Sequence, residues 1–327
     1  MAEDMNMSRR TVIAGAGAAV SALGASSPGA AATPPAGRQS PGVYRYNVGE
    51  VEVTALIDGV ARRPVTAEFV RNAPLEEVKG ALKDAFIDPN VLPITFTLLA
   101  VNTGGRLIVI DTGTGGRMAT TAGQALENLA AGGIDARAVD TVLISHFHAD
   151  HIGGLRLKDG SLAFPNAEVV VPEAEWAYWM DDGEMGRAAE GMRKGFQIVR
   201  EIFQPMAKDV RRFKGAVEPV PGVTAIPTPG HTPGHTSFRI SSGSDQLIVW
   251  SDVTNHPALF VRNPGWHAVF DMDPNEAEQQ RKRMLDMVAT DRLRVAGFHF
   301  PFPAVGHIAQ RNAREFAFVP DNWNPAL

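Results

Sequence analysis

The chain has 327 residues, of which 44% are hydrophobic and 20% charged, which is enough apolar material for a large globular core. It carries 31 basic against 36 acidic residues, a net charge of −5, whereas proteins that bind nucleic acid usually have a basic excess. Nucleic acid is therefore not an expected partner. The absence of cysteine excludes disulfides, thiolate metal ligands and cysteine nucleophiles.

The N-terminus has the organisation of an export signal. Arg9 and Arg10 precede an uncharged stretch rich in alanine and glycine, which ends in a run of small residues suited to cleavage. The paired arginines resemble a twin-arginine signal, so we expect a signal peptide over residues 1–32 and a periplasmic or secreted protein. The stretch is too weakly hydrophobic for a lasting membrane anchor. We expect a linker at 33–42 and a single domain at 43–327.

Short apolar runs and helical patterns interleave along the rest of the chain. Strands are expected at residues 51–55, 94–101, 107–110, 142–144, 167–171 and 247–250. Helices are expected at residues 74–85, 123–131, 173–180, 184–203 and 274–290. For the last helix, Asp273 is expected to cap the N-terminus, with Pro274 at the first position and Glu276 completing a capping box. The interleaving indicates an α/β or α+β protein with layered sheets.

A dense group of metal-binding residue types follows one predicted strand directly. The six residues from His146 to His151 read His-Phe-His-Ala-Asp-His, and two glycines come shortly after them. Alternate residues at a strand end point the same way, so His146 and His148 can share one side, while the turn lets Asp150 and His151 face a neighbouring point. Two such points form a dinuclear metal site. Imidazole and carboxylate donors without sulfur suit zinc or another borderline divalent ion.

Further donors stand at the ends of later predicted elements. His231 lies in a rigid turn, Thr-Pro-Gly-His-Thr-Pro-Gly-His, that ends at His235. Asp252 follows a predicted strand, and His299 follows another apolar run. A lone His-x-His or a lone aspartate after a strand is more often structural than metal-binding. The complete set in this order rarely arises by chance, and it predicts a dinuclear site.

This pattern resembles the metallo-β-lactamase superfamily of metallohydrolases over nearly all of residues 43–310. The resemblance implies a four-layer αβ/βα sandwich with two divalent metal ions, Zn²⁺ in the first place, between the sheet edges. It also implies the metal ligands: His146, His148 and His231 for one ion, Asp150, His151 and His299 for the other, and Asp252 bridging both. Asp111, in Ile-Asp-Thr-Gly, matches a supporting aspartate of the family. We expect His235 to orient neighbouring loops rather than to bind metal.

The charges of this set favour hydrolysis. The positive charge of two divalent ions exceeds the combined negative charge of Asp150, Asp252 and a metal-bridging hydroxide. The excess stabilises an oxygen that becomes electron-rich in the transition state. Metal ions also lower the pKa of bound water, to about 7 in well-studied zinc sites. We therefore expect a metal-bridging hydroxide to act as the nucleophile, with Asp150 and Asp252 as the catalytic carboxylates.

Other features indicate a branch of the superfamily. An aspartate rather than a cysteine at position 252 argues against the main class of zinc β-lactamases. The segments Gly297–Pro303 and Glu175–Met180 resemble the methyl parathion hydrolase group, which includes exported organophosphate hydrolases, aryl esterases and lactonases. Such substrates need an apolar, aromatic pocket. The candidates to line it are Phe147, Trp176, Trp179 and Phe196.

We therefore expect a dinuclear metallohydrolase that cleaves neutral esters, first of all organophosphate triesters and aryl esters. A lactonase is the alternative. It is weakened because acyl-homoserine lactonases of this superfamily carry a tyrosine shortly after the bridging aspartate, where this chain reads Val253-Thr254-Asn255. A metal-holding protein without catalytic activity is a further alternative. The expected partner is a small ester, lactone or organophosphate, and the resemblance suggests a homodimer.

Overall fold

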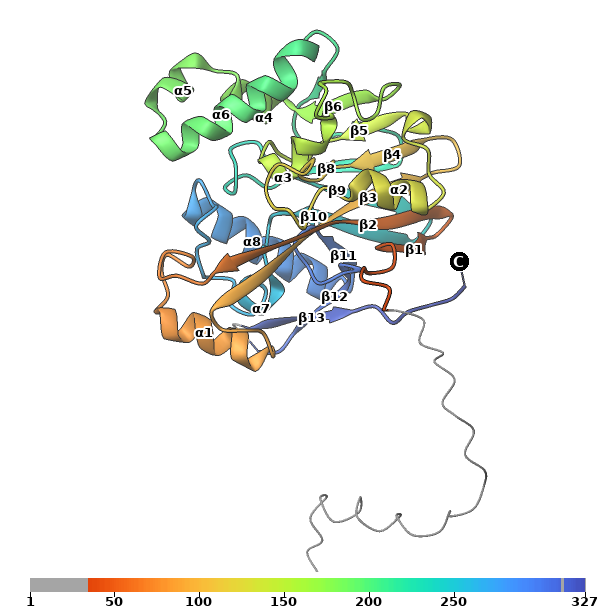
Figure 1. Ribbon diagram of the computed structural model, residues 1–327. Helices are drawn as coiled ribbons and strands as arrows, with labels where there is room; N and C mark the ends of the chain where they lie inside the picture. Colours follow the sequence, from red (N-terminus) through yellow and green to blue (C-terminus); the bar gives the residue numbers. More distant parts are fainter. Residues whose placement is uncertain (1–34, 313–314, 327) are drawn as a thin grey trace, which may run out of the picture. The chain divides into compact units, whose positions relative to one another are not determined.

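The fold is built on two β-sheets packed face to face (Figure 1). The computed structural model describes residues 35–312 and 315–326, so the predicted signal peptide at 1–32 and the first residues of the predicted linker lie outside the described residues. All the strands and helices belong to the unit that runs from Pro41 to Leu327. In the part of the chain described here, no helix combines the length and the apolar character needed to cross a membrane.

The first sheet has seven strands that follow one another in chain order. They are β1 Val43–Val48, β2 Val51–Pro64, β3 Val91–Asn102, β4 Leu107–Ile110, β5 Thr141–Leu143, β6 Glu168–Pro172 and β7 Arg211–Phe213. The strands from β1 to β4 pair antiparallel, and those from β4 to β7 pair parallel. The carboxyl ends of β4 and β5 therefore lie side by side at one edge of this sheet.

The second sheet has six strands in the order β13-β12-β11-β10-β9-β8. They are β8 Val223–Pro227, β9 Thr236–Ser242, β10 Asp245–Ser251, β11 Arg294–Gly297, β12 Val305–Gln310 and β13 Phe316–Pro320. Only β10 and β11 pair parallel among the described strands of this sheet. Their carboxyl ends are therefore also neighbours.

Helices cover the outer face of each sheet (Figure 1). The helices are α1 Leu75–Asp84, α2 Ala125–Ala131, α3 Ala149–Ile152, α4 Glu173–Trp179, α5 Asp182–Arg187, α6 Glu190–Phe203, α7 Pro257–Phe260 and α8 Pro274–Thr290. Short 3₁₀ turns lie at Ala136–Ala138, Gly153–Leu155 and Gln204–Met206.

The alternation of apolar side chains along the strands explains the layers. On β10, Leu247 and Val249 belong to the core between the sheets, whereas Ile248 and Trp250 belong to the core that also contains Met284 of α8. Because strand side chains alternate between faces, a strand that is apolar at every position is buried on both sides. Two sheets with helices outside make the four-layer αβ/βα sandwich that the sequence predicted.

Two details of the helices differ from the sequence prediction. The helix expected at 184–203 is broken into α5 and α6 at Ala188 and Ala189, whose backbone is extended. Glycines in α5 weaken it as a continuation of α6, and Arg200 Nη1 of α6 donates to Asp182 of α5 at 2.6 Å, which holds the two segments together.

The capping box predicted for α8 is only half formed. Asp273 accepts hydrogen bonds from the backbone N–H groups of Asn275 and Glu276, as an N-cap does. The N–H of Asp273 does not pair with the Glu276 side chain but donates to the carbonyl of Gly230 at 2.8 Å. This bond attaches the start of α8 to the turn that carries His231.

Candidate metal centre

The predicted donors lie where parallel strands end. β5 ends at Leu143, and the chain continues through His146 and His148 into the short helix α3, which carries Asp150 and His151. Asp252 directly follows β10, and His299 follows β11 by two residues. In layered α/β sheets, the carboxyl ends of the strands are the usual place for a site. The two sheets bring their strand ends together here.

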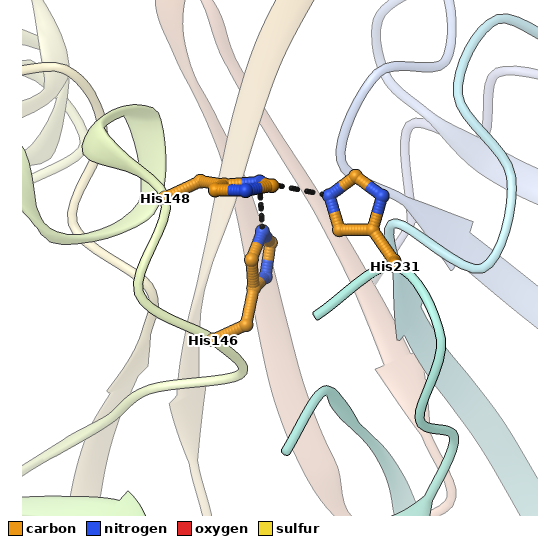
Figure 2. A group of neighbouring side chains, drawn as sticks. All are labelled: His146, His148 and His231. Carbon is orange, nitrogen blue, oxygen red and sulfur yellow. Dashed lines mark hydrogen bonds between the residues drawn. The ribbon is translucent and has the colours of Figure 1, made fainter. Parts of the chain in front are cut away.

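Three imidazoles form the first cluster. His148 Nδ1 lies 3.1 Å from His146 Nε2 and 2.9 Å from His231 Nε2 (Figure 2). His146 and His148 come from the segment after β5, and His231 comes from the turn after β8. The ligand atoms of these three residues all lie within 4.8 Å of one another, close enough to hold one metal ion.

Asp150, His151 and His299 form the second cluster, again with ligand atoms within 4.8 Å of one another. The Asp150 carboxylate lies 3.7 Å from His151 Nε2 and 3.5 Å from His299 Nε2. His151 and His299 are buried. The two clusters are the two donor sets that the resemblance implies.

Asp252 contacts both clusters. Its Oδ1 lies 3.3 Å from His151 Nε2, and its Oδ2 lies 3.2 Å from His231 Nε2 and 3.0 Å from His299 Nε2. The carboxylate therefore occupies the position expected of a bridging ligand. The structure thus brings together all seven residues that the sequence singled out.

The orientation of the imidazoles fits a metal ion. His151 Nδ1–H donates to Asp111, and His299 Nδ1–H donates to the carbonyl of Thr95, both at 2.8 Å. These bonds leave the Nε2 lone pairs directed at the centre. His151 Nε2 and Asp252 Oδ1 are buried without a hydrogen-bond partner among the described residues. Buried polar atoms of this kind are costly unless a cation pairs with them.

The electrostatics of the clusters also call for positive charge. Burial, with neighbouring histidines, holds the pKa of His146 and His148 well below the usual value. Both imidazoles are therefore neutral, the form in which histidine binds a metal ion. Burial alone would raise the pKa of Asp252, but His299 and His151 hold it well below its usual range. Burial would likewise lower the pKa of His151, yet Asp252 and two other aspartates raise it well above normal. The carboxylates thus stabilise cations at this point.

Asp111 has the supporting position expected of it. Its Oδ1 accepts the backbone N–H of Ser145 at 2.8 Å, and its Oδ2 accepts the Ser145 hydroxyl and His151 Nδ1–H at the same distance. Asp111 adopts φ of 60°, a conformation that costs a residue with a Cβ atom roughly 1–2 kcal/mol. The hydrogen bonds of its carboxylate hold it there.

His235 positions Asp252. Its Nε2 accepts the backbone N–H of Asp252 at 3.0 Å, and its Nδ1 lies 3.1 Å from the carbonyl of Thr228. Burial lowers the pKa of His235 to about 3, so the ring is neutral and can accept this bond. Because both ring nitrogens are occupied within the protein, His235 is not placed to bind a metal.

The residues that orient His231 were not predicted from the sequence. His231 Nδ1–H donates to Asp271 Oδ1 at 2.9 Å, and Asp271 Oδ2 accepts from Arg281 Nη2 at 2.8 Å. Arg281 is 1% exposed, and its other nitrogens donate to backbone carbonyls. The sequence offered one indication of this role, which is that Arg281 lies on the apolar face of α8 together with Ala277 and Met284.

A cavity of about 320 Å³ opens beside the clusters. Donors from both clusters line it, together with largely apolar side chains and Arg63 and Asn255 as further polar groups. The apolar residues include Ile94, Phe96, Trp179, Met192, Val269 and Phe270. A pocket of this size and character suits a small, neutral, partly apolar ligand.

Of the four aromatic side chains expected in the pocket, only Trp179 lines it. Phe147 stacks on Phe203 with ring centroids 4.4 Å apart, in the core beneath α6. Phe196 packs against Trp179 with ring centroids 4.8 Å apart, and Trp176 lies under the guanidinium of Arg212. These three positions belong to the helix packing because α4 and α6 bury their apolar faces against the sheet.

The comparison with known proteins identifies the family. The profile of the Metallo-beta-lactamase superfamily matches residues 90–299. This chain belongs to the metallo-β-lactamase superfamily. The fold agrees, because "hydrolase AbOPH in beta lactamase superfamily" superposes with a TM-score of 0.83 at 27% identity, covering 88% of this chain and 100% of that one. The superfamily predicted from the sequence is thereby confirmed.

Other metallo-β-lactamase relatives carry the names of lactonases. AidC, a dizinc quorum-quenching lactonase in complex with a product, superposes with a TM-score of 0.81 at 26% identity, covering 87% of this chain and 99% of that chain. An N-acyl homoserine lactonase from Bacillus sp is 32% identical over 101 residues, which are 31% of this chain and 32% of the relative. One from Bacillus cereus is 29% identical over 108 residues, 33% of this chain and 35% of the relative. The match thus spans about a third of the curated relatives' length.

The role of Asp271 can be tested through metal affinity. Asp271→Asn keeps the shape of the side chain but removes the charge that orients His231. We expect zinc affinity to fall by roughly 10- to 100-fold, the usual effect of removing a partner of a metal-binding histidine. The measurement is zinc content after dialysis against buffered zinc. Asp286→Asn, on the exposed face of α8, is the control, and equal zinc affinity in both variants would contradict the assignment.

Proposed function

We propose that this protein is a hydrolase that depends on two zinc ions and cleaves small neutral esters. The observation that carries the proposal is that two three-residue donor clusters meet at the buried carboxylate of Asp252, in the wall of an apolar pocket. Divalent ions in such a site supply Lewis acidity and make water nucleophilic near neutral pH. The membership of the superfamily and the dizinc lactonase of similar fold support the proposal.

In this proposal each group of residues has a definite task. His146, His148 and His231 hold one ion, Asp150, His151 and His299 hold the other, and Asp252 is shared. Asp111 and Asp271 fix the rings of His151 and His231 so that the Nε2 lone pairs face the ions. His235 fixes the backbone of Asp252. The chain thus builds the centre before substrate arrives, which is what electrostatic catalysis requires.

We propose lactones and other carboxylic esters as the first substrate class. The lactonase names of AidC and of the Bacillus relatives support this class more strongly than the sequence alone did. Asn255 lines the pocket, and its Oδ1 accepts the backbone N–H of His256 at 2.9 Å. Its amide NH₂ is therefore the group available to a substrate oxygen, three residues after Asp252. In this proposal the Asn255 amide is the hydrogen-bond donor to the substrate oxygen, in place of the tyrosine of the lactonases.

Aryl esters fall within this first class, and organophosphate triesters with aryl leaving groups are the second candidate class. The observation in their favour is Trp179, whose ring lines the pocket and lies 6.2 Å from the ring of His148. An aromatic wall this close to the donors suits an aryl leaving group. A non-catalytic metal-holding protein is disfavoured, because the pocket reaches donors of both clusters and gives a substrate access to them.

Replacing Asp252 tests the proposed centre. Asp252→Ala removes the carboxylate that, among the described residues, contacts both clusters, so we expect loss of turnover and of bound zinc with the fold retained. Ester hydrolysis, zinc content by elemental analysis and circular dichroism measure these effects. Asp245→Ala, at the exposed end of the same strand, is the matched control. A fully metallated and active Asp252→Ala protein would refute the proposed function.

A panel of substrates separates the two classes. We expect initial rates on an acyl-homoserine lactone, dihydrocoumarin and an aryl acetate to exceed the rate on methyl paraoxon, with no turnover of a β-lactam. Faster hydrolysis of methyl paraoxon would instead assign a phosphotriesterase. Trp179→Ala is expected to change the preference among aryl substrates without changing zinc content, since Trp179 offers no metal-binding atom.

We also propose that the N-terminus directs twin-arginine export to the periplasm or outside the cell, and that the mature protein is a homodimer. Replacing Arg9 and Arg10 by lysine should leave the precursor in the cytoplasm of a host with this pathway, since the pair is the recognised element. Fractionation and immunoblotting measure the distribution, with a variant at Arg38 as control. Normal export of the double variant would exclude this route.

The proposed homodimer is tested separately, by measuring the molar mass of the mature protein with light scattering.

A further inference from the structure

A buried carboxylate lies outside the seven proposed ligands and contacts three parts of the site. Glu175, on α4, is 0% exposed. Its Oε2 accepts the backbone N–H of Phe147 at 2.9 Å and the indole Nε1–H of Trp179 at 2.8 Å. Its Oε1 accepts the backbone N–H of Gly234 at 2.7 Å. One side chain therefore joins three segments of the chain.

Each of these donors has a specific place in the site. Phe147 lies between the two histidines of the first cluster that follow β5. Gly234 belongs to the turn that carries His231, the third histidine of that cluster, and it directly precedes His235. Trp179 lines the pocket. Glu175 thus connects both loops of the first cluster to the wall of the pocket.

The three contacts favour an ionised carboxylate. Backbone N–H groups and an indole N–H can only donate, and a carboxylate accepts at both oxygens without presenting a donor of its own. Burial raises the pKa of Glu175, whereas the Thr232 hydroxyl, and after it the bonds from Gly234, Phe147 and Trp179, favour the ionised form. Hydrogen bonds to an ionised acceptor are about twice as strong as neutral ones, which offsets the cost of burial.

The close approach of the turn to α4 is a second observation at the same place. A Cβ atom added at Gly234 would lie 2.3 Å from the backbone nitrogen of Glu175 and 2.7 Å from the carbonyl carbon of Ala174. Only glycine fits here without a shift of backbone. The histidine turn is therefore seated directly on α4, at the residue whose carboxylate binds it.

We propose that Glu175 is a positioning residue, which sets the spacing of the two loops that carry the first histidine cluster and holds Trp179 in the pocket wall. Metal binding and the shape of the substrate pocket then depend on the same carboxylate. This proposal rests on the proposed zinc centre, and it adds a coupling between that centre and the pocket. Glu175 itself contacts neither cluster's donor atoms in any hydrogen bond of the described residues.

Glutamine is the informative replacement, because it keeps the shape but has one acceptor oxygen. In one orientation the glutamine oxygen takes the place of Oε2 and still accepts from Phe147 and Trp179. Its NH₂ group then faces the N–H of Gly234, and the turn carrying His231 is released. In the other orientation the oxygen accepts from Gly234, and both Phe147 and Trp179 lose their acceptor. The first orientation loses fewer bonds, so we expect Glu175→Gln to act mainly on the turn with His231.

The experiment compares zinc affinities of metal-depleted mature proteins by competition with a chelator. We expect Glu175→Gln to weaken at least one zinc equivalent by roughly 10- to 100-fold, as removal of an outer partner of a metal site does. Glu173→Gln is the control, because Glu173 lies on the same helix and its side chain makes no hydrogen bond in the described structure. This variant should leave the affinities for both zinc equivalents unchanged. Unchanged zinc affinities in Glu175→Gln would overturn the proposal. If this variant does not fold, Glu175→Asp takes its place, because the shorter carboxylate cannot reach all three donors.

The coupling to the pocket has its own readout. Trp179→Phe keeps an aromatic ring but removes the bond to Glu175, so we expect a higher KM with zinc affinity unchanged. In the Glu175→Gln protein the same change should raise KM less than in the wild type, since the indole N–H then donates to a neutral amide oxygen and this bond is weaker. Additive effects would overturn the coupling. If the wild-type protein has no esterase activity but Glu175→Gln still lowers zinc affinity, only the proposed function is refuted. If the wild-type protein is active but Glu175→Gln leaves zinc affinity unchanged, only this inference is refuted.

Discussion

The site depends on one buried contact, in which the carboxylate of Asp252 lies among imidazoles from both donor clusters. Its oxygens lie 3.0–3.3 Å from the Nε2 atoms of His151, His231 and His299. A carboxylate removed from water in this way is stable only beside positive charge. The surrounding hydrogen bonds have one common effect, which is to keep lone pairs and negative oxygens directed at the same small volume.

The fold makes this arrangement possible through two pairs of parallel strands. β4 and β5 end beside each other in one sheet, and β10 and β11 do so in the other. Asp111 and Ser251, at the ends of β4 and β10, both have positive φ, and the Ser145 hydroxyl contacts the side chains of both. Two of the five described non-glycine residues with positive φ therefore lie where the two sheets meet at the site.

The clustering of the seven donor side chains could be predicted from the sequence because its signal is local and chemically unusual, with four donors in six residues and the rest in turns or at strand ends. The roles of Asp271 and Glu175 could not be predicted in this way. Asp271 contacts His231 across 40 positions, and Glu175 contacts Phe147 and Gly234 across 28 and 59, separations that no spacing rule encodes. The same reason explains the pocket aromatics. Periodicity shows that Phe147 and Phe196 are buried, but not which face of the buried layer borders the cavity.

The buried charges also connect metal binding to folding. Glu175, Asp111, Asp252 and Asp271 are all buried, and Asp271 alone among them has an arginine partner in the described structure. The others rely on hydrogen bonds and on imidazoles, so their negative charge is stable only with positive charge beside it. Ions that bind the folded chain and not the unfolded one stabilise it by an amount that grows with the logarithm of their concentration. The residues that orient the donors therefore serve stability and metal affinity together.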